Sequence, residues 1–373
     1  MNQATRDQFD PSSAAEQFHN LHELVARARA NLDQNSWDYI VGGAETETTL
    51  RRNRMALDEI AFRPRVLRDV SKVDPSIDIF GHRLRIPVML APVGALESFA
   101  PEAAAAVVRG AGAFGASHML SSVCAPGLEA VAKASPDALR IFQLYVRGDD
   151  AFVCDYVERA IANGYSAFCL TVDTAHYSRR ERDLAKRYVT AGRRGASGQT
   201  YQMGLSWRTV KLIKDKYKIP LIIKGIGTAE DAKIALDHGV EGIYVSNHGG
   251  RQLDHGRGSM HVLPEVVQTV GGRAKIIVDG AFCRGTDIVK GLASGADLIG
   301  IGRLQCWALA AAGEAGIVRM LELLEDEVTR CLGLLGVTRF SELDASYLCA
   351  ATPANPPHVL SAFPLLDIAP YRY

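Results

Sequence analysis

The sequence lacks an excess of charge of either sign. Its 373 residues include 42 Lys and Arg and 42 Asp and Glu, so the formal net charge at pH 7 is zero. A protein that binds nucleic acid or an anionic membrane through its overall charge carries a basic excess. We therefore expect neither of these as the main partner. A small anionic ligand held by a few local cations is compatible with the composition.

Long apolar runs and paired cysteines are also missing. No apolar stretch reaches the roughly 18 residues of a membrane-spanning helix, and the polar N-terminus lacks the pattern of a signal peptide. The seven cysteines are odd in number and form no C-x-x-C pair, which disfavours a disulfide framework or a zinc site. We expect a cytoplasmic protein with reduced thiols, without membrane insertion and without a bound metal.

Apolar residues make up 47 % of the chain, enough for a sizeable core. The pattern predicts three parts: a leader and helical preface over residues 1–80, a main domain over 81–340 and a tail over 341–373. Within the preface, residues 1–17 are expected to be a mobile leader, and helical spacing from Phe18 to about Leu57 is interrupted at Gly42-Gly43. The tail from Thr352 contains five prolines and no helical period, so we expect an oligomer contact or a cover over the site.

The main domain alternates short apolar runs with stretches of helical periodicity. Near-continuous apolar strands that alternate with helices indicate a parallel sheet covered on both faces. Eight such units close into a (β/α)8 TIM barrel. The alternative is an open doubly wound sheet, but no G-x-G-x-x-G follows the first strand. The predicted strands are Val88–Pro92, His118–Ser122, Arg140–Val146, Ala167–Asp173, Pro220–Gly225, Gly242–Ser246, Lys275–Asp279 and Leu298–Gly302.

The carboxyl ends of these strands carry the polar residues, and this is the end where barrels place their active sites. The most distinctive segment is Val245–Asp254, which puts His248 and Arg251 on one glycine-rich turn. Histidine titrates near neutrality and suits proton abstraction, and arginine holds a carboxylate through two parallel hydrogen bonds. This pair fits the oxidation of a 2-hydroxy acid; the alternative is a structural histidine in a barrel-end turn.

This segment resembles the FMN-dependent 2-hydroxy acid oxidase and dehydrogenase family, and the likeness extends from about Leu21 to about Gly336. The resemblance implies an FMN enzyme that oxidises an L-2-hydroxy acid to the 2-keto acid, with transfer to flavin N5. It also implies a homo-oligomer, specifically a tetramer. His248 is then the catalytic base, and Arg251 binds the substrate carboxylate.

Further motifs carry the resemblance along the chain. The segment Thr171–Arg180 matches the family's strand-four motif, so Asp173 should pair with His248 and Arg180 should be the second carboxylate clamp. A helix N-cap and a surface ion pair are the respective alternatives. Tyr145 and Tyr39 correspond to the family's tyrosines at the substrate and catalytic centre, although Tyr39 also suits core packing.

A lone lysine, Lys224, interrupts an apolar run, which is costly unless it faces an anion. The family places this lysine beside the flavin. The resemblance assigns to FMN the residues Pro92, Val93, Gly94, Ser121, Gln143, Thr171, Lys224, Ser246, Asp279, Gly280, Ala281, Gly302 and Arg303.

The chain departs from the family at the turn after strand seven, where Cys283 replaces the arginine that contacts the FMN phosphate. A hydrogen bond to a charged group contributes about 1.5–3 kcal/mol, so FMN should bind more weakly unless Arg284 compensates. Val123 and Tyr177 also differ from the common residues, which indicates a reshaped substrate pocket. Two alternative functions stay open: a flavin barrel that acts on a phosphorylated or larger substrate, and a degenerate barrel without catalysis.

Overall fold

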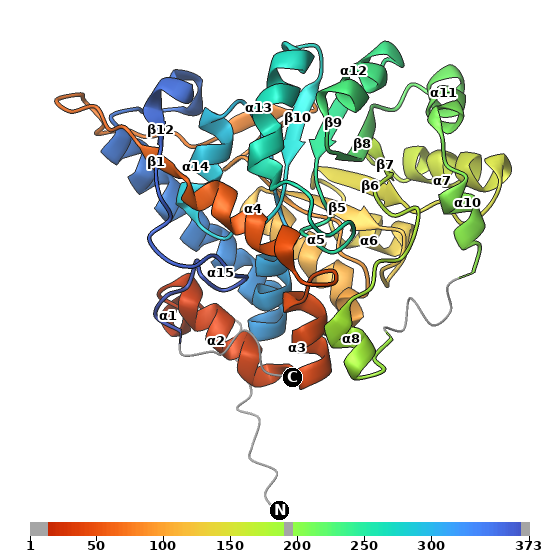
Figure 1. Cartoon of the computed structure of the whole chain (residues 1–373), viewed down its shortest axis with the longest axis horizontal. Helices are drawn as coiled ribbons and strands as arrows, with labels where there is room; N and C mark the ends of the chain where they lie inside the picture. The colour runs from red at the N-terminus through yellow and green to blue at the C-terminus, as the bar shows by residue number, and fades with distance from the viewer. Residues whose placement is uncertain (1–13, 190–196, 367–373) are drawn as a thin grey trace, which may run out of the picture.

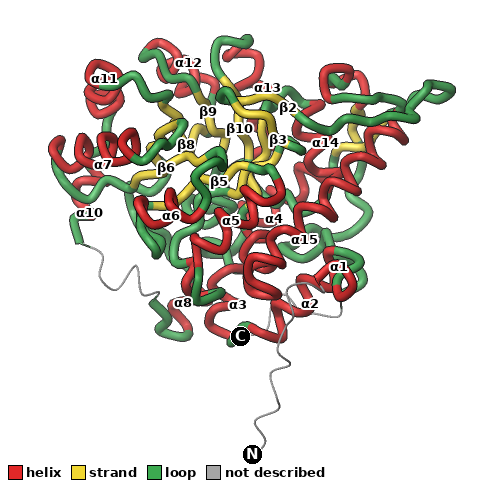
Figure 2. The backbone as a smooth tube through the Cα atoms, turned by 180° about the vertical axis from the view of Figure 1, so that it is seen from behind, coloured by secondary structure: helices red, strands yellow, loops and turns green. Residues whose placement is uncertain are grey.

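A closed barrel of eight parallel strands forms the centre of the molecule, as the sequence predicts (Figures 1 and 2). The computed structural model describes residues 14–189 and 197–366. Each strand coincides with one of the eight predicted runs, with ends that differ by up to two residues. In spatial order the strands are β10 (Lys275–Val278), β11 (Leu298–Ile301), β4 (Val88–Leu90), β5 (Ser117–Ser121), β6 (Arg140–Leu144), β7 (Ala167–Thr171), β8 (Leu221–Ile226) and β9 (Gly242–Val245).

Helices surround the barrel and bury its outer face. Apolar residues of strands and helices form one large core layer between them, which is the packing that continuous apolar strands require. The helices that follow the strands are α5 (Ala103–Phe114), α6 (Leu128–Ala134), α7 (Asp150–Ala162), α8 (Glu181–Ala185), α10 (Gln199–Met203), α11 (Trp207–Lys216), α12 (Ala229–Asp237), α13 (Ser259–Val270), α14 (Gly285–Ala293) and α15 (Arg303–Leu335), together with the 3-10 turn η2 (Leu96–Ser98).

The barrel interior is a second, separate apolar cluster. A hairpin of β2 (Ile77–Ile79) and β3 (His82–Leu84) adds Ile79 and Leu84 to this cluster. We infer that the hairpin closes the amino-terminal end of the barrel, because the carboxyl ends of the strands carry the polar residues. The strands contribute Met89, Met119, Ile141, Cys169, Ile222, Tyr244, Ile277 and Leu298.

Tyr244 of β9 points into the barrel interior and restricts residue 300 of β11. The ring is fully buried, and a Cβ added at Gly300 would lie 2.2 Å from the Tyr244 hydroxyl oxygen. Because real Cβ atoms do not approach an oxygen so closely, residue 300 must be glycine while residue 244 is tyrosine.

The described part of the preface contains four helices, two more than the single interruption at Gly42-Gly43 indicates. They are α1 (Ala14–Gln17), α2 (Leu21–Asn31), α3 (Gln34–Val41) and α4 (Thr48–Asp58). The Asp33 side chain accepts a hydrogen bond from the Ser36 amide and starts α3, because an N-cap satisfies a free helix donor. The expected mobile leader was wrong at its end: Ala14 is buried and begins a helix. Residues 1–13 of that leader lie outside the described part.

Segments before and after the barrel pair with each other, which the sequence analysis did not foresee. Strand β1 (Ile60–Phe62) pairs antiparallel with β12 (Leu348–Ala350). Two 3-10 turns, η3 (Phe340–Glu342) and η4 (Ala345–Tyr347), precede β12. From residue 352 to 366 the tail has turns and no helix, as expected.

A buried ion pair fastens the preface to the barrel. Arg54 of α4 donates two hydrogen bonds, of 2.9 and 2.8 Å, to the Asp287 carboxylate of α14. Both side chains are at most 6 % exposed. Asp287 also accepts hydrogen bonds from the backbone amides of Cys283 and Arg284. The pair therefore holds the turn after β10 in its conformation.

Replacing Asp287 by alanine should strongly destabilise the fold. The variant leaves the Arg54 guanidinium buried beside Asp58 alone, and breaking a buried pair typically costs about 3–5 kcal/mol. Urea unfolding at a fixed FMN concentration measures the change. The control is Asp215→Ala, which removes an exposed pair with Lys211 and should have little effect. Equal losses in the two variants would contradict this role for Asp287.

Candidate active site

The rim of the barrel is polar because side chains in a strand alternate with a period of two. Each strand has an apolar residue that points into the barrel interior. The next residue that points inward comes two positions later, toward the carboxyl end of the strand. Ser121 follows Met119 in this way, and Gln143 follows Ile141. The same step leads to Thr171, Lys224, Ser246 and Asp279 on the next strands. One geometric rule thus brings six of the expected site residues to one end of the barrel.

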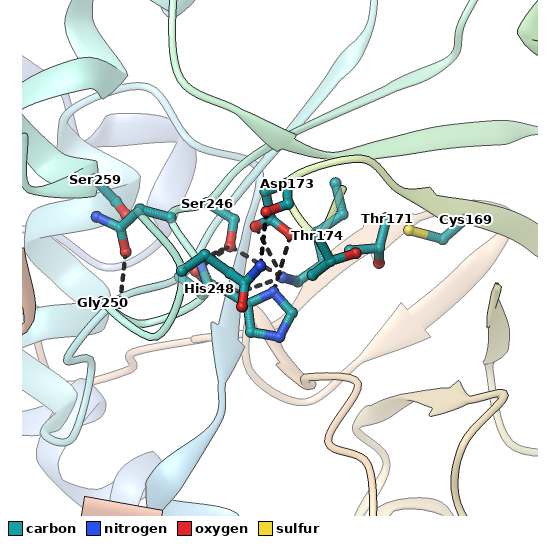
Figure 3. A network of polar contacts seen from close by, with 12 residues as sticks. Cys169, Thr171, Asp173, Thr174, Ser246, His248, Gly250 and Ser259 are labelled. Carbon is teal, nitrogen blue, oxygen red and sulfur yellow. Dashed lines mark hydrogen bonds and ion pairs between the residues drawn. The ribbon is translucent and has the colours of Figure 1, made fainter. Parts of the chain in front are cut away.

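His248, Asp173 and Tyr145 form a connected group at this rim, and Figure 3 shows His248 near Asp173 and Ser246. The Nδ1 atom of His248 lies 3.0 Å from Asp173 Oδ1. On the other side of the ring, Nε2 lies 3.3 Å from the Tyr145 hydroxyl. An imidazole whose Nδ1 faces a carboxylate is held as the tautomer with a free Nε2 lone pair. The group can therefore accept a proton at Nε2.

The turn that carries His248 has an unusual backbone. His248, Gly249 and Gly250 all have positive φ, at 59°, 63° and 74°, a conformation that side chains other than glycine rarely adopt. A Cβ at Gly250 would lie 2.4 Å from the Leu50 amide nitrogen. The His248 amide donates to Ser246 Oγ over 3.1 Å, which helps to hold the turn.

Lys224 lies buried between two carboxylates. Its Nζ donates to Ser246 Oγ over 3.1 Å, and Ser246 donates to Asp279 Oδ1 over 2.7 Å. The distances from Nζ to Asp173 Oδ2 and Asp279 Oδ2 are 4.0 and 3.9 Å, too long for hydrogen bonds. The ammonium thus neutralises nearby charge and keeps hydrogen-bonding capacity for another acceptor.

Burial and charge set the protonation of the group. Burial lowers the pKa of His248, and the Asp173 carboxylate opposes this shift. Burial alone would raise the pKa of Asp173, but His248 and Lys224 hold it below its ordinary value. Burial raises the pKa of Tyr145 far above its ordinary range. At neutral pH the group therefore contains a neutral imidazole, a carboxylate and a neutral phenol.

Tyr39 of α3 lies between two guanidinium groups. The centre of its ring is 4.8 Å from the Arg251 guanidinium and 5.9 Å from that of Arg180, within the range of cation–π attraction. Burial, followed by the charge of Arg180, lowers the pKa of Arg251 to about 9. Arg251 thus stays charged at neutral pH, and no carboxylate pairs with either arginine among the described residues. The structure brings Tyr39, Arg180 and Arg251 together, which are three of the four predicted substrate residues.

The carboxyl end of α3 joins this region to the cofactor side. Arg251 donates to the carbonyls of Tyr39 and Gly42 over 2.6 and 2.8 Å. Arg303 donates to the carbonyls of Ile40 and Gly42 over 2.8 and 2.9 Å. Helix carboxyl ends leave carbonyls without intrahelical partners, and cations there are favourable. The two arginines therefore position α3 over the barrel mouth.

One large cavity contains most of the predicted site. It is lined by Tyr39, Pro92, Val93, Gly94, Tyr145, Arg180, Lys224, His248, Arg251, Asp279, Gly280, Ala281, Gly302 and Arg303. Ser121, Gln143, Thr171, Asp173 and Ser246 are not part of its lining. In the described part of the chain, five basic and two acidic side chains line the cavity. A cavity with such an excess of buried positive charge suits an anion.

Two side chains below the cavity have polar atoms without partners. The amide nitrogen and oxygen of Gln143 and the hydroxyl of Thr171 are buried and make no hydrogen bond within the described structure. Buried polar groups almost always have a partner. A heterocycle that offers both donors and acceptors, as a flavin does, would satisfy them. The residues therefore fit FMN, whose negative phosphate suits the partly buried Arg303.

The turn after β10 resolves the question about Cys283 and Arg284. Cys283 lines the cavity, and burial raises the pKa of its thiol to about 12, so it is uncharged. Arg284 forms an ion pair with Glu327 over 2.5 Å and donates to the Ala362 carbonyl over 3.3 Å. It is absent from the cavity lining. The structure thus gives Arg284 partners outside the cavity lining, which favours the view that it does not replace the missing arginine.

Several supporting residues escaped the sequence analysis. Gln252 donates to the carbonyls of Asp173 and His176, each over 3.0 Å. Asp254 accepts a 2.7 Å hydrogen bond from the Thr49 amide at the start of α4. Burial raises the pKa of Asp254, but such hydrogen bonds outweigh this and lower it to about 2. Both residues belong to the distinctive Val245–Asp254 segment. The sequence therefore pointed to this segment, but it gave no function for these two residues.

Comparison with known proteins agrees with this geometry. The family model described as FMN-dependent dehydrogenase matches residues 28–350. This chain belongs to that family, and it is an FMN enzyme that oxidises CH–OH groups. Among the described residues, no helix combines the length and apolar character needed to span a membrane.

The relatives are 2-hydroxy acid oxidases. The chain is 38 % identical to glycolate oxidase of Spinacia oleracea over 353 residues, which covers 89 % of this chain and 95 % of the relative. It is 36 % identical to L-lactate oxidase of a Nostoc species over 356 residues, covering 88 % and 97 %. A crystal structure of mandelate oxidase superimposes with a TM-score of 0.83 at 35 % identity, covering 91 % and 100 %.

Replacing Asp173 by asparagine should change the pH profile of kcat/KM in two ways. Because Asp173 raises the pKa of His248, its removal should move the acidic limb to lower pH. The plateau should fall by about 10²–10⁴, since the imidazolium that forms loses its partner. Anaerobic flavin reduction between pH 4 and pH 9 measures both effects. An acidic limb at unchanged pH would show that another group controls it.

Proposed function

We propose that the protein oxidises a small L-2-hydroxy acid to the 2-keto acid, with His248 as the base. One observation carries the proposal: the neutral imidazole, with its Nδ1 held by Asp173, lines the same cavity as Arg180 and Arg251. A base beside two carboxylate-binding cations matches a substrate that has a hydroxyl next to a carboxylate.

Arg180 and Arg251 would bind the substrate carboxylate. Both guanidiniums flank the Tyr39 ring, and Arg251 is fixed in place by the α3 carbonyls. A planar guanidinium that is already positioned loses little freedom when it binds a carboxylate. The bound acid would then lie with its carbinol carbon next to His248 and Tyr145.

Oxidation of the carbinol carbon to a carbonyl removes two protons and two electrons. One proton leaves to His248 Nε2, and the other hydrogen would leave together with the two electrons to FMN when FMN is bound. Asp173 stabilises the imidazolium that results. The Tyr145 hydroxyl, which stays protonated, can donate a hydrogen bond to the substrate oxygen. FMN, when bound, accepts the electrons. Gln143, Thr171 and Lys224 would hold its ring, and Arg303 its phosphate.

The FMN-loaded protein should lose its flavin absorbance when mixed with an L-2-hydroxy acid under anaerobic conditions. His248→Ala should slow this reduction by at least about 10²–10⁴ and leave FMN bound. Stopped-flow absorbance with glycolate, L-lactate, L-mandelate and their D-enantiomers, where these exist, measures it. Reduction by phosphorylated ligands alone, or normal reduction in the variant, would contradict the proposal.

Arg180→Met should weaken substrate capture far more than FMN binding, because the side chain has no ion-pair partner within the described residues. Arg180→Lys should restore only part of the loss, since an ammonium does not form a bidentate pair. Arg251→Met is a less specific test, as Arg251 also fixes α3. The measurements are the substrate Kd from reduction kinetics and the FMN Kd. A neutral ester that reacts as fast as the acid would disprove carboxylate recognition.

A further inference from the structure

The end of the described chain folds into a compact hook. We use the name C-terminal hook for residues 358–366. The Ser361 amide donates to the His358 carbonyl over 3.1 Å, and the Phe363 amide donates to the Leu360 carbonyl over 2.8 Å. The Leu366 amide donates to the Phe363 carbonyl over 3.1 Å. Successive turns therefore give this segment a defined shape without a helix.

Aromatic packing anchors the hook to the preface and to α15. The Phe363 ring is 1 % exposed and packs edge-on against Trp307 and His22, with ring centres 5.8 and 5.6 Å apart. Leu360 is 3 % exposed. Burying a phenylalanine side chain removes a large apolar surface from water and so stabilises the packing. This anchoring makes the hook a fixed part of the fold.

Arg284 connects the hook to the turn after β10. Its Nη1 donates to the Ala362 carbonyl, while Nε and Nη2 contact Glu327 of α15. The neighbouring residue in sequence, Cys283, lines the cavity. A connection between hook and cavity wall thus runs through two adjacent residues.

The hook also reaches the cavity itself. Val359 is 8 % exposed and lines the cavity together with Cys283. Gly280, Ala281 and Arg303 line the same cavity. The family resemblance assigns these residues to FMN, and the turn after β10 is where the family's arginine contacts the phosphate. The cavity lining thus includes the uncharged thiol of Cys283, at the position where the family has an arginine, and an apolar side chain from the tail.

We propose that the C-terminal hook is part of the FMN site: it covers the phosphate end of the cavity beside Cys283 and slows the release of FMN. The small side chain of Cys283 leaves room that Val359 helps to fill. Excluding water from this end strengthens the attraction between Arg303 and a phosphate, because charges interact more strongly at low dielectric. The hook thus offsets the loss of an arginine contact by enclosure.

The first experiment compares two substitutions within the hook. Phe363→Ala removes the buried anchor, whereas Leu365→Ala changes a side chain that is 82 % exposed. The FMN dissociation rate, followed by flavin fluorescence after dilution of the holoenzyme, should rise about tenfold or more in Phe363→Ala. It should be unchanged in Leu365→Ala. Equal rates in the two variants would overturn the proposal, and because no substrate is used the result is independent of the proposed reaction.

The second experiment combines Cys283→Arg with deletion of residues 352–373. The deletion alone should speed FMN release. In the full chain, Cys283→Arg should not slow release, because the hook occupies the adjacent space. In the shortened chain the same substitution should slow it by about tenfold or more. Additive effects of the two changes would overturn the proposal.

If the shortened chain does not fold, the same double-mutant cycle is carried out with Val359→Ala in place of the deletion. This variant keeps the anchor and removes the apolar contact with the cavity. It should release FMN faster than the native chain, and Cys283→Arg should reverse the increase. An unchanged release rate in Val359→Ala, together with an unaltered response to Cys283→Arg, would overturn the proposal.

Discussion

The site depends on one constraint, the alternation of side chains in a closed barrel. Inward positions recur every second residue. The inward residues that follow the apolar interior cluster therefore all lie around the mouth of the barrel. Lys224, Ser246 and Asp279 lie together for this reason, although they come from three separate strands. The apolar interior cluster excludes water below them, so their charges interact through a medium of low dielectric. The apolar interior thus sets both the position and the electrostatics of the polar rim.

The barrel alone does not complete the site, because α3 of the preface supplies its upper wall. The Gly42 carbonyl accepts hydrogen bonds from both Arg251 and Arg303, the first proposed to bind the substrate and the second the cofactor. Tyr39 comes from the same helix. The helix-end carbonyls thereby reduce the repulsion between the two guanidinium groups. Both charges stay available to anionic ligands. The preface is therefore a functional part of the molecule as well as a structural one.

Much of this arrangement could be predicted because it follows local rules. The eight strands were recognisable as apolar runs, and the residues after them necessarily reach one rim. The residue types of the segment around His248 indicated a base next to a carboxylate-binding cation. By contrast, the β1–β12 pairing, the ion pair of Arg284 with Glu327 and the contact of Phe363 with Trp307 join segments far apart in the chain. No periodicity encodes such contacts. Short elements such as α1 were missed because tertiary packing of Ala14 stabilises them.

The packing of Tyr244 against Gly300 has a consequence for how this sequence can vary over evolution. The phenol occupies the space that any side chain at position 300 would need, so neither residue is free to drift alone. A larger residue at 300 becomes acceptable only after 244 has become smaller, and the intermediate then contains either a clash or a void. Both routes pass through a less stable protein. Positions 244 and 300 should therefore covary among related sequences, even though neither residue is predicted to contact a ligand.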